Sequence, residues 1–91
     1  MSRRKAKRER EFEDLLHHLE IQMFLAEEAY GKADWAVRFA RDRSFDGLYA
    51  FVLPTLETER SQAWQTYDLL RAEVHACRHT LMVLESSKAT H

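Results

Sequence analysis

The side chains of this chain that could do chemistry form two small polar groups, and most of them are carboxylates. Glu27 and Glu28 are adjacent, and Glu59 and Arg60 stand close to Gln62 further along the chain. Carboxylates that project inward from facing helices can hold a pair of metal ions. The same groups can instead form salt bridges that fix the register of two helices. Which of these applies depends on the elements that carry the two groups.

Two long stretches of the sequence share one apolar rhythm, and they contain the two polar groups. Apolar residues follow one another at alternating steps of four and three, with Arg60 as the one charged exception. This heptad rhythm keeps one seam of a helix turned toward a partner helix, whereas strands alternate with period two. The first seam comprises Phe12, Leu16, Leu19, Met23, Ala26, Tyr30, Ala33, Val37 and Ala40, and the second comprises Tyr49, Leu53, Leu56, Arg60, Ala63, Tyr67, Leu70, Val74, Cys77, Leu81 and Leu84. The sequence therefore predicts an all-α fold of two helices with heptad seams.

The seams and the polar residues around them predict where the two helices begin and end. We expect helices over about residues 9–43 and 48–85, joined by a turn at 44–47. A connection this short predicts that the second helix folds back antiparallel to the first, as a hairpin. Residues 1–8 are then a basic flexible arm, and residues 86–91 are a loose polar tail.

Four residues near the turn predict how the second helix begins. Ser44 is a candidate N-cap, with Asp46 in the first helical turn. Pro54 has no backbone N–H, so we expect the helix to kink or restart there. Thr55 is a candidate cap for the restarted segment.

An antiparallel hairpin with this turn brings together residues whose numbers sum to about 89, such as Phe12 and Cys77. This pairing buries both seams but leaves other large apolar residues uncovered. Those toward the turn are Trp35, Phe39, Phe45, Leu48, Phe51 and Val52, and those toward the open end are Leu15, Ile21, Phe24, Leu25, Met82 and Val83. Soluble proteins rarely leave so much apolar surface in water, and a single hairpin offers only a small core. The sequence therefore predicts a homodimer that forms a four-helix bundle.

The charge of this chain of 91 residues is unevenly distributed. Its net charge is −1, but the first ten residues carry +5, which leaves −6 for the remainder. The basic residues of that segment are Arg3, Arg4, Lys5, Lys7, Arg8 and Arg10. An acidic body argues against a broad basic groove, whereas the arm alone could contact the phosphates of a nucleic acid.

The cysteine content and the apolar pattern of the sequence indicate the cellular compartment of the protein. Cys77 is the only cysteine, so the chain cannot form an internal disulfide, and its seam position predicts a buried thiol. No run of about 18 apolar residues is present, and no apolar stretch follows the basic N-terminus as in a signal peptide. We therefore expect a cytoplasmic protein that does not enter a membrane.

His75 and His79 have the spacing of helical metal ligands, but they fall on an outward face, so we interpret them as surface histidines.

The residues around the two polar groups also resemble a known family. They are Glu27, Glu28, Asp34, Trp35, Ala40, Leu48, Ala50, Glu59, Ala63, Thr66, Leu70 and Arg71. Over residues 27–71 the chain resembles half of a ferritin-like bundle, in particular the two-helix encapsulated ferritins. The resemblance implies a di-iron site that is completed on dimerisation, with Glu59 and either Glu28 or Glu27 as ligands. Gln62 stands where the family has a ligand His, and an amide is a poor replacement for imidazole at iron.

Two functions follow from these patterns. No catalytic nucleophile or Gly-rich phosphate loop stands out, so the sequence favours a non-enzymatic interaction or adaptor protein. Such a protein would self-associate, dock on a protein partner, and use its basic arm to contact phosphates, including those of nucleic acid. Buried aromatic side chains often dominate the energy of an interface. The anchor candidates are Trp35, Phe39, Trp64 and Phe24. The alternative is a ferritin-like iron protein with Glu28 and Glu59 as metal ligands. If the protein is instead an interaction protein, no cofactor is expected.

Overall fold

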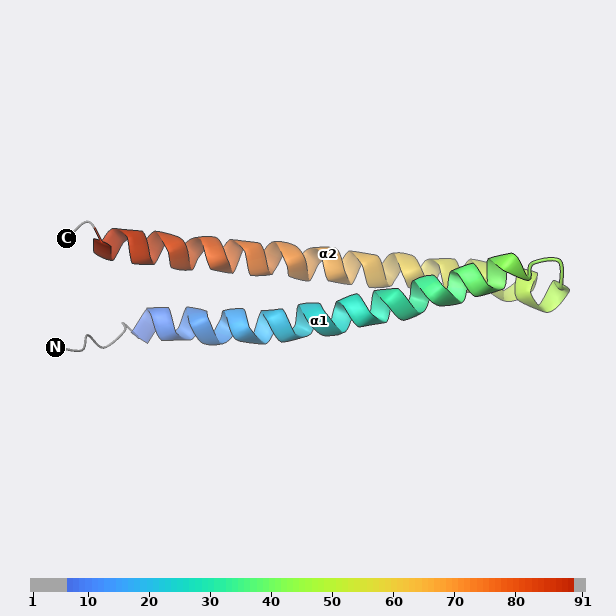
Figure 1. Cartoon of the computed structure of the whole chain (residues 1–91), viewed down its shortest axis with the longest axis horizontal. Coiled ribbons are helices and arrows are strands. Elements are labelled where there is room, and N and C mark those ends of the chain that lie inside the picture. The colour runs from blue at the N-terminus through green and yellow to red at the C-terminus, as the bar shows by residue number, and fades with distance from the viewer. Residues whose placement is uncertain (1–6, 90–91) are drawn as a thin grey trace.

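The computed structural model describes residues 7–89, which form two long helices packed side by side as a hairpin (Figure 1). Helix α1 spans Lys7–Asp42 and helix α2 spans Gly47–Ala89. The turn occupies residues 43–46, one residue earlier than expected. The hairpin is 69 Å long, with the turn at one end and the start of α1 and the end of α2 at the other. The predicted all-α hairpin is confirmed.

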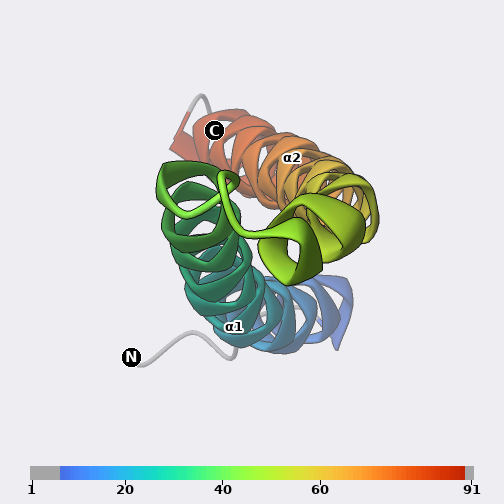
Figure 2. The ribbon, with the colours of Figure 1, turned by 90° about the vertical axis from the view of Figure 1, so that its right-hand side faces the viewer.

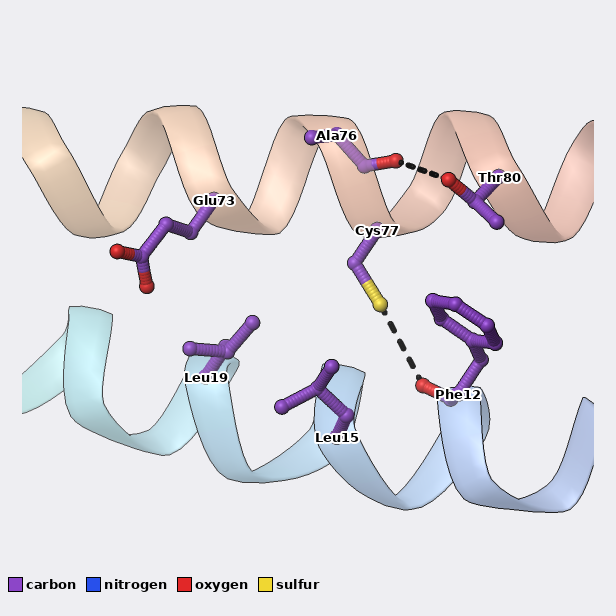
Figure 3. Close-up of a pocket in the computed structure, with 7 residues that line it drawn as sticks. All are labelled: Phe12, Leu15, Leu19, Glu73, Ala76, Cys77 and Thr80. Atoms are coloured by element: carbon purple, nitrogen blue, oxygen red, sulfur yellow. Dashed lines mark hydrogen bonds between the residues drawn. The ribbon is translucent and has the colours of Figure 1, made fainter. Parts of the chain in front are cut away.

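The two predicted seams form the interface between α1 and α2. Every seam residue is buried or half-buried, and Val37 and Val74 are the largest fully buried side chains. Seen from the turn, the helices wind around one another, as heptad seams require (Figure 2). Near the open end, the buried Cys77 thiol donates a hydrogen bond to the Phe12 carbonyl at 3.4 Å (Figure 3). The predicted pairing of these two residues is therefore confirmed.

Asp46, and not Ser44, caps the beginning of α2. The Asp46 carboxylate accepts a hydrogen bond from the Leu48 backbone N–H at 2.9 Å, and its carbonyl accepts one from Ala50 at 3.0 Å. The prediction of Ser44 as N-cap is wrong, because the Ser44 N–H still bonds the Arg41 carbonyl at 3.2 Å and closes the end of α1. Asp is among the preferred residues directly before the first helical position.

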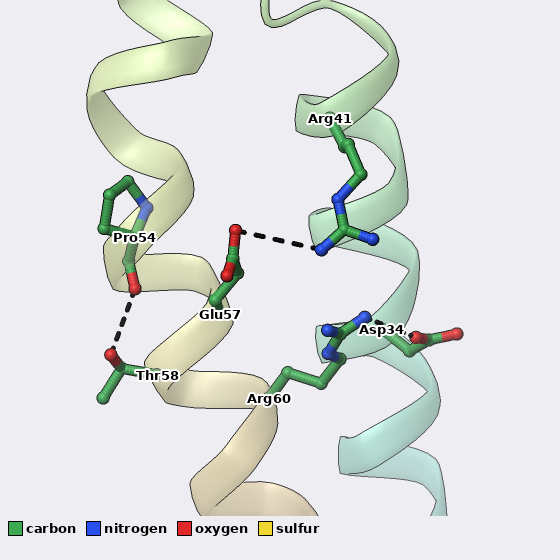
Figure 4. Close-up of polar contacts among 6 residues, drawn as sticks. All are labelled: Asp34, Arg41, Pro54, Glu57, Thr58 and Arg60. Atoms are coloured by element: carbon green, nitrogen blue, oxygen red, sulfur yellow. Dashed lines mark hydrogen bonds and ion pairs between the residues drawn. The ribbon is translucent and has the colours of Figure 1, made fainter.

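Pro54 lies inside α2 and does not end it. The helix is continuous across this position, so the expected restart with Thr55 as its cap is wrong. Proline removes one backbone donor, which leaves the Ala50 carbonyl without its helical partner. Both residues are exposed, so water can reach that carbonyl. One turn further on, the Thr58 hydroxyl donates to the Pro54 carbonyl at 3.0 Å (Figure 4).

The outer surfaces of both helices mix charged side chains with large apolar ones. Because charges interrupt every apolar stretch, neither helix within residues 7–89 is apolar enough over a sufficient length to cross a membrane. The apolar residues outside the seams are instead confined to short stretches of the helix surfaces and to the turn.

Candidate interaction surface

Ion pairs between the helices follow one side of the hairpin. Arg78 lies 2.7 Å from Glu20 near the open end, and Arg41 lies 3.8 Å from Glu57 near the turn (Figure 4). Each of these four residues directly follows a seam residue, which places them all on the same side of the antiparallel pair. Exposed pairs of this kind contribute about 0–1 kcal/mol each. They favour the observed register more than they stabilise the fold.

Arg60, the charged residue of the second seam, forms an ion pair with Asp34, which also pairs with Arg38. Its Nη1 lies 3.2 Å from Asp34 Oδ1, and the Arg38 Nε lies 3.0 Å from Asp34 Oδ2. The Arg60 and Asp34 side chains are only 29% and 20% exposed. The sequence did not single out Asp34 as this partner. The feature that could have identified Asp34 is its position directly after the seam residue Ala33, on the side of the hairpin that carries the other ion pairs.

Glu28 and Glu59, the ligands that the ferritin-like resemblance implies, are both exposed and belong to different helices. Among residues 7–89, no three His, Cys, Asp or Glu side chains are close enough to hold a metal ion. Gln62 is exposed, and the guanidinium of Arg60 is held by Asp34. Within one chain, these residues therefore do not fit an iron site.

A second periodic pattern follows the side of α1 that faces away from α2. It comprises Ile21, Leu25, Glu28, Lys32, Trp35 and Phe39, which we call the outer stripe. Its steps again alternate between four and three, and residues at these steps share one helix face. All of its members except the half-buried Phe39 are exposed, and Trp35 is 64% exposed. The outer stripe is thus an uncovered helix face with the periodicity of a packing seam.

The aromatic end of the outer stripe is held in place by contacts near the turn. Trp35 stacks on Phe39 with ring centroids 4.9 Å apart, and Phe39 meets Tyr49 edge-on at 5.8 Å. The Arg43 guanidinium lies 3.6 Å from the centroid of the Phe39 ring and donates to the Phe39 carbonyl at 3.3 Å. Trp35 is therefore positioned before any partner binds, which lowers the entropy cost of using it as an anchor.

The middle of the outer stripe is charged and has a gap beside it at Gly31. Nothing lies within 4 Å of the place that a Cβ on Gly31 would occupy. Gly31 lines an open surface pocket of about 430 Å³ together with Glu28, Lys32 and Trp35. Glycine costs a helix about 1 kcal/mol relative to alanine. No contact among the described residues requires glycine here, whereas its missing side chain lets another helix approach closely.

The other two predicted anchors lie in different surroundings. Trp64 packs between Tyr30 and Tyr67, with ring centroids 5.3 and 5.7 Å away, and 43% of it stays exposed. Phe24 lies on α1 beside the outer stripe and is 58% exposed. Phe24 therefore lies beside the Ile21 and Leu25 end of the outer stripe, away from Trp35 and Phe39, whereas Trp64 contributes to packing within the hairpin.

The basic segment lies partly inside α1. Lys7, Arg8 and Arg10 are exposed in the first turns of the helix, so α1 begins within the segment expected to be an arm. The remaining predicted phosphate-contacting residues, Arg3, Arg4 and Lys5, lie outside the described residues. His75 and His79 are exposed, as their outward positions predict.

Two surfaces of the chain are thus suited to binding, the outer stripe of α1 and the basic residues at its beginning. Comparison with models of known protein families, with curated proteins and with solved structures finds no match to this chain. Its function is therefore inferred from these two surfaces.

Proposed function

We propose that this protein is a non-enzymatic interaction protein that self-associates and presents its basic N-terminal residues to a macromolecular partner. The observation that carries this proposal is the exposure of Trp35, Ile21 and Leu25 on one periodic face of α1. A face of this kind is a common docking element when it meets another apolar helix.

Self-association would also supply the core that a single hairpin lacks. The seams bury few large side chains completely. Among the described residues, the largest side chains that are fully buried are those of Val37 and Val74. Two-helix units of this length gain stability when a second unit covers their remaining apolar surface. Two hairpins docked through the faces of α1 that point away from α2 would form a four-helix assembly with the two α1 helices between the two α2 helices. This assembly would have an acidic body and two basic segments.

Replacing Trp35 by Ala is expected to raise the dissociation constant of the homodimer about tenfold or more, because aromatic anchors carry much of an interface's energy. The oligomeric state is measured by sedimentation velocity over a range of protein concentrations. The matched control is Trp64→Ala, which removes the same side chain from a site inside the hairpin. That variant should lower the melting temperature while changing association less. A wild-type chain that stays monomeric at micromolar concentrations would refute self-association.

Replacing Arg3, Arg4 and Lys5 together by Gln is expected to weaken binding to a labelled DNA duplex and to reduce its salt dependence. Each phosphate contact contributes about 0.9 to the slope of log K against log salt, so the slope should fall by up to about 2.7. Fluorescence anisotropy at several salt concentrations measures both quantities. These three residues precede α1, so the helices stay intact. An unchanged slope would show that Arg3, Arg4 and Lys5 make no phosphate contact.

A further inference from the structure

The outer stripe is symmetric about residue 30 in both spacing and chemistry. Its pairs are Ile21 with Phe39, Leu25 with Trp35, and Glu28 with Lys32, and the two numbers in each pair sum to 60. Two apolar pairs therefore flank one pair of opposite charges. A helix face with this property can meet a copy of itself across a two-fold axis, because each residue then faces its complement.

We infer that a second copy of this chain docks on the outer stripe, with the two α1 helices antiparallel and the two-fold axis at the level of residue 30. This inference rests on the proposed self-association, and it adds the face, the direction and the register of the contact. The two α1 helices lie at the centre of the assembly, and each is covered on its other side by its own α2.

The charges select the antiparallel direction. Neither Glu28 nor Lys32 has an ion-pair partner among the described residues of its own chain, and both are exposed. In the antiparallel arrangement, Glu28 of each copy faces Lys32 of the other, which forms two ion pairs. A parallel arrangement would place Glu28 against Glu28 and Lys32 against Lys32. Like charges placed opposite one another at an interface disfavour that arrangement.

Small residues at the axis allow the two helices to approach. Tyr30 itself points into the seam of the hairpin, where its ring contacts Trp64 at 5.3 Å. The residues on either side of it are Ala29 and Gly31, both exposed, and Gly31 faces open space. Small side chains at a helix crossing shorten the distance between the axes and improve the contact of the larger residues around them. The unexplained glycine thus acquires a role at the centre of the interface.

The same register also accounts for apolar residues beyond the outer stripe. Phe45 at the turn is 88% exposed, and its number and that of Leu15 again sum to 60. Leu15 lines a pocket of about 340 Å³ near the open end, in the groove between α1 and α2 (Figure 3). The other lining residues are Phe12 and Leu19 from α1 and Glu73, Ala76, Cys77 and Thr80 from α2. The turn of one copy therefore lies at the level of the apolar pocket of the other.

Two single charge reversals test this arrangement. Both Glu28→Lys and Lys32→Glu place like charges opposite one another twice in the antiparallel homodimer. Since two exposed ion pairs are replaced by two like-charge contacts, we expect either variant to raise the dissociation constant roughly tenfold at low salt. An equimolar mixture of the two variants restores opposite charges at both contacts. Sedimentation velocity should then show a heterodimer of nearly wild-type affinity.

The double variant Glu28→Lys with Lys32→Glu should also dimerise as the wild type does. The matched control is Glu27→Lys, which makes the same charge change at an exposed neighbour outside the outer stripe. It should leave the dissociation constant within about twofold of wild type. A parallel dimer would tolerate each single reversal, and that result would overturn the inference. A wild-type dimer whose dissociation constant is unchanged by all four substitutions would disprove the antiparallel contact through this face while leaving self-association intact. A monomeric wild type would refute the proposed function itself.

Discussion

Replacing Val37 by Asp is expected to lower the free energy of unfolding by more than about 3 kcal/mol, because it places an unpaired carboxylate in the seam. Val37 is 0% exposed and is one of the two largest fully buried side chains of the hairpin. A loss of that size is a large share of the roughly 5–15 kcal/mol that stabilises a typical domain. Urea denaturation followed by far-ultraviolet circular dichroism measures the change, and much of the helical signal should already be lost without urea.

The control for this result is Val52→Asp, the same substitution at a position of α2 that is 41% exposed. Its carboxylate remains in contact with water, so the free energy of unfolding should fall by less than about 1 kcal/mol. Equal losses at the two positions would contradict the assignment of the core to the heptad seams.

Replacing Asp34 by Ala is expected to lower the free energy of unfolding by about 1–3 kcal/mol, because Arg60 then keeps its charge in the seam without a carboxylate. The lower part of that range is favoured, since water reaches both side chains, which are 20% and 29% exposed. Replacing Arg60 by Leu instead continues the apolar seam, and such replacements are often neutral or stabilising. The two substitutions at one ion pair should therefore have different consequences.

A double-mutant cycle separates the pair from its surroundings. In the Arg60→Leu background, Asp34→Ala should cost clearly less than it does in the wild type, and the difference is the coupling between the two residues. The remaining cost reports the second contact of Asp34, the ion pair with Arg38 at 3.0 Å. If Asp34→Ala costs the same in both backgrounds, the Arg60 contact contributes nothing to stability.

These predictions divide the surface of α1 into two faces with different roles. The seam that contains Val37 holds α1 to α2 within the chain. The outer stripe has the same alternating steps and reaches α2 through the Phe39 ring, which meets Tyr49. It is the face that we assign to a second copy. A change in the seam should unfold the chain, whereas a charge reversal in the outer stripe should leave the fold intact and weaken the dimer.

The helices, their seams and their antiparallel pairing follow from the order of the residues alone. Periodicity is a local property, because the helix turns by a fixed angle per residue and so decides which side chains share a face. The pairing of Phe12 with Cys77 therefore follows from the periodicity, and so does the burial of Val37 and Val74. The uncovered apolar residues were also evident, because they do not fit either seam.

Which polar groups meet depends on how the two helices pack against each other. Asp34 lies across the hairpin from Arg60, and their contact depends on the relative rotation of the helices and the reach of a long side chain. Asp46, and not Ser44, caps α2 because the Ser44 N–H already bonds the end of α1. Helix α2 continues across Pro54, and the seam residues on both sides of the proline stay packed against α1. The carboxylates that first suggested metal chemistry, Glu28 and Glu59, are exposed on separate helices. Their spacing in the sequence did not fix how the two helices would orient them.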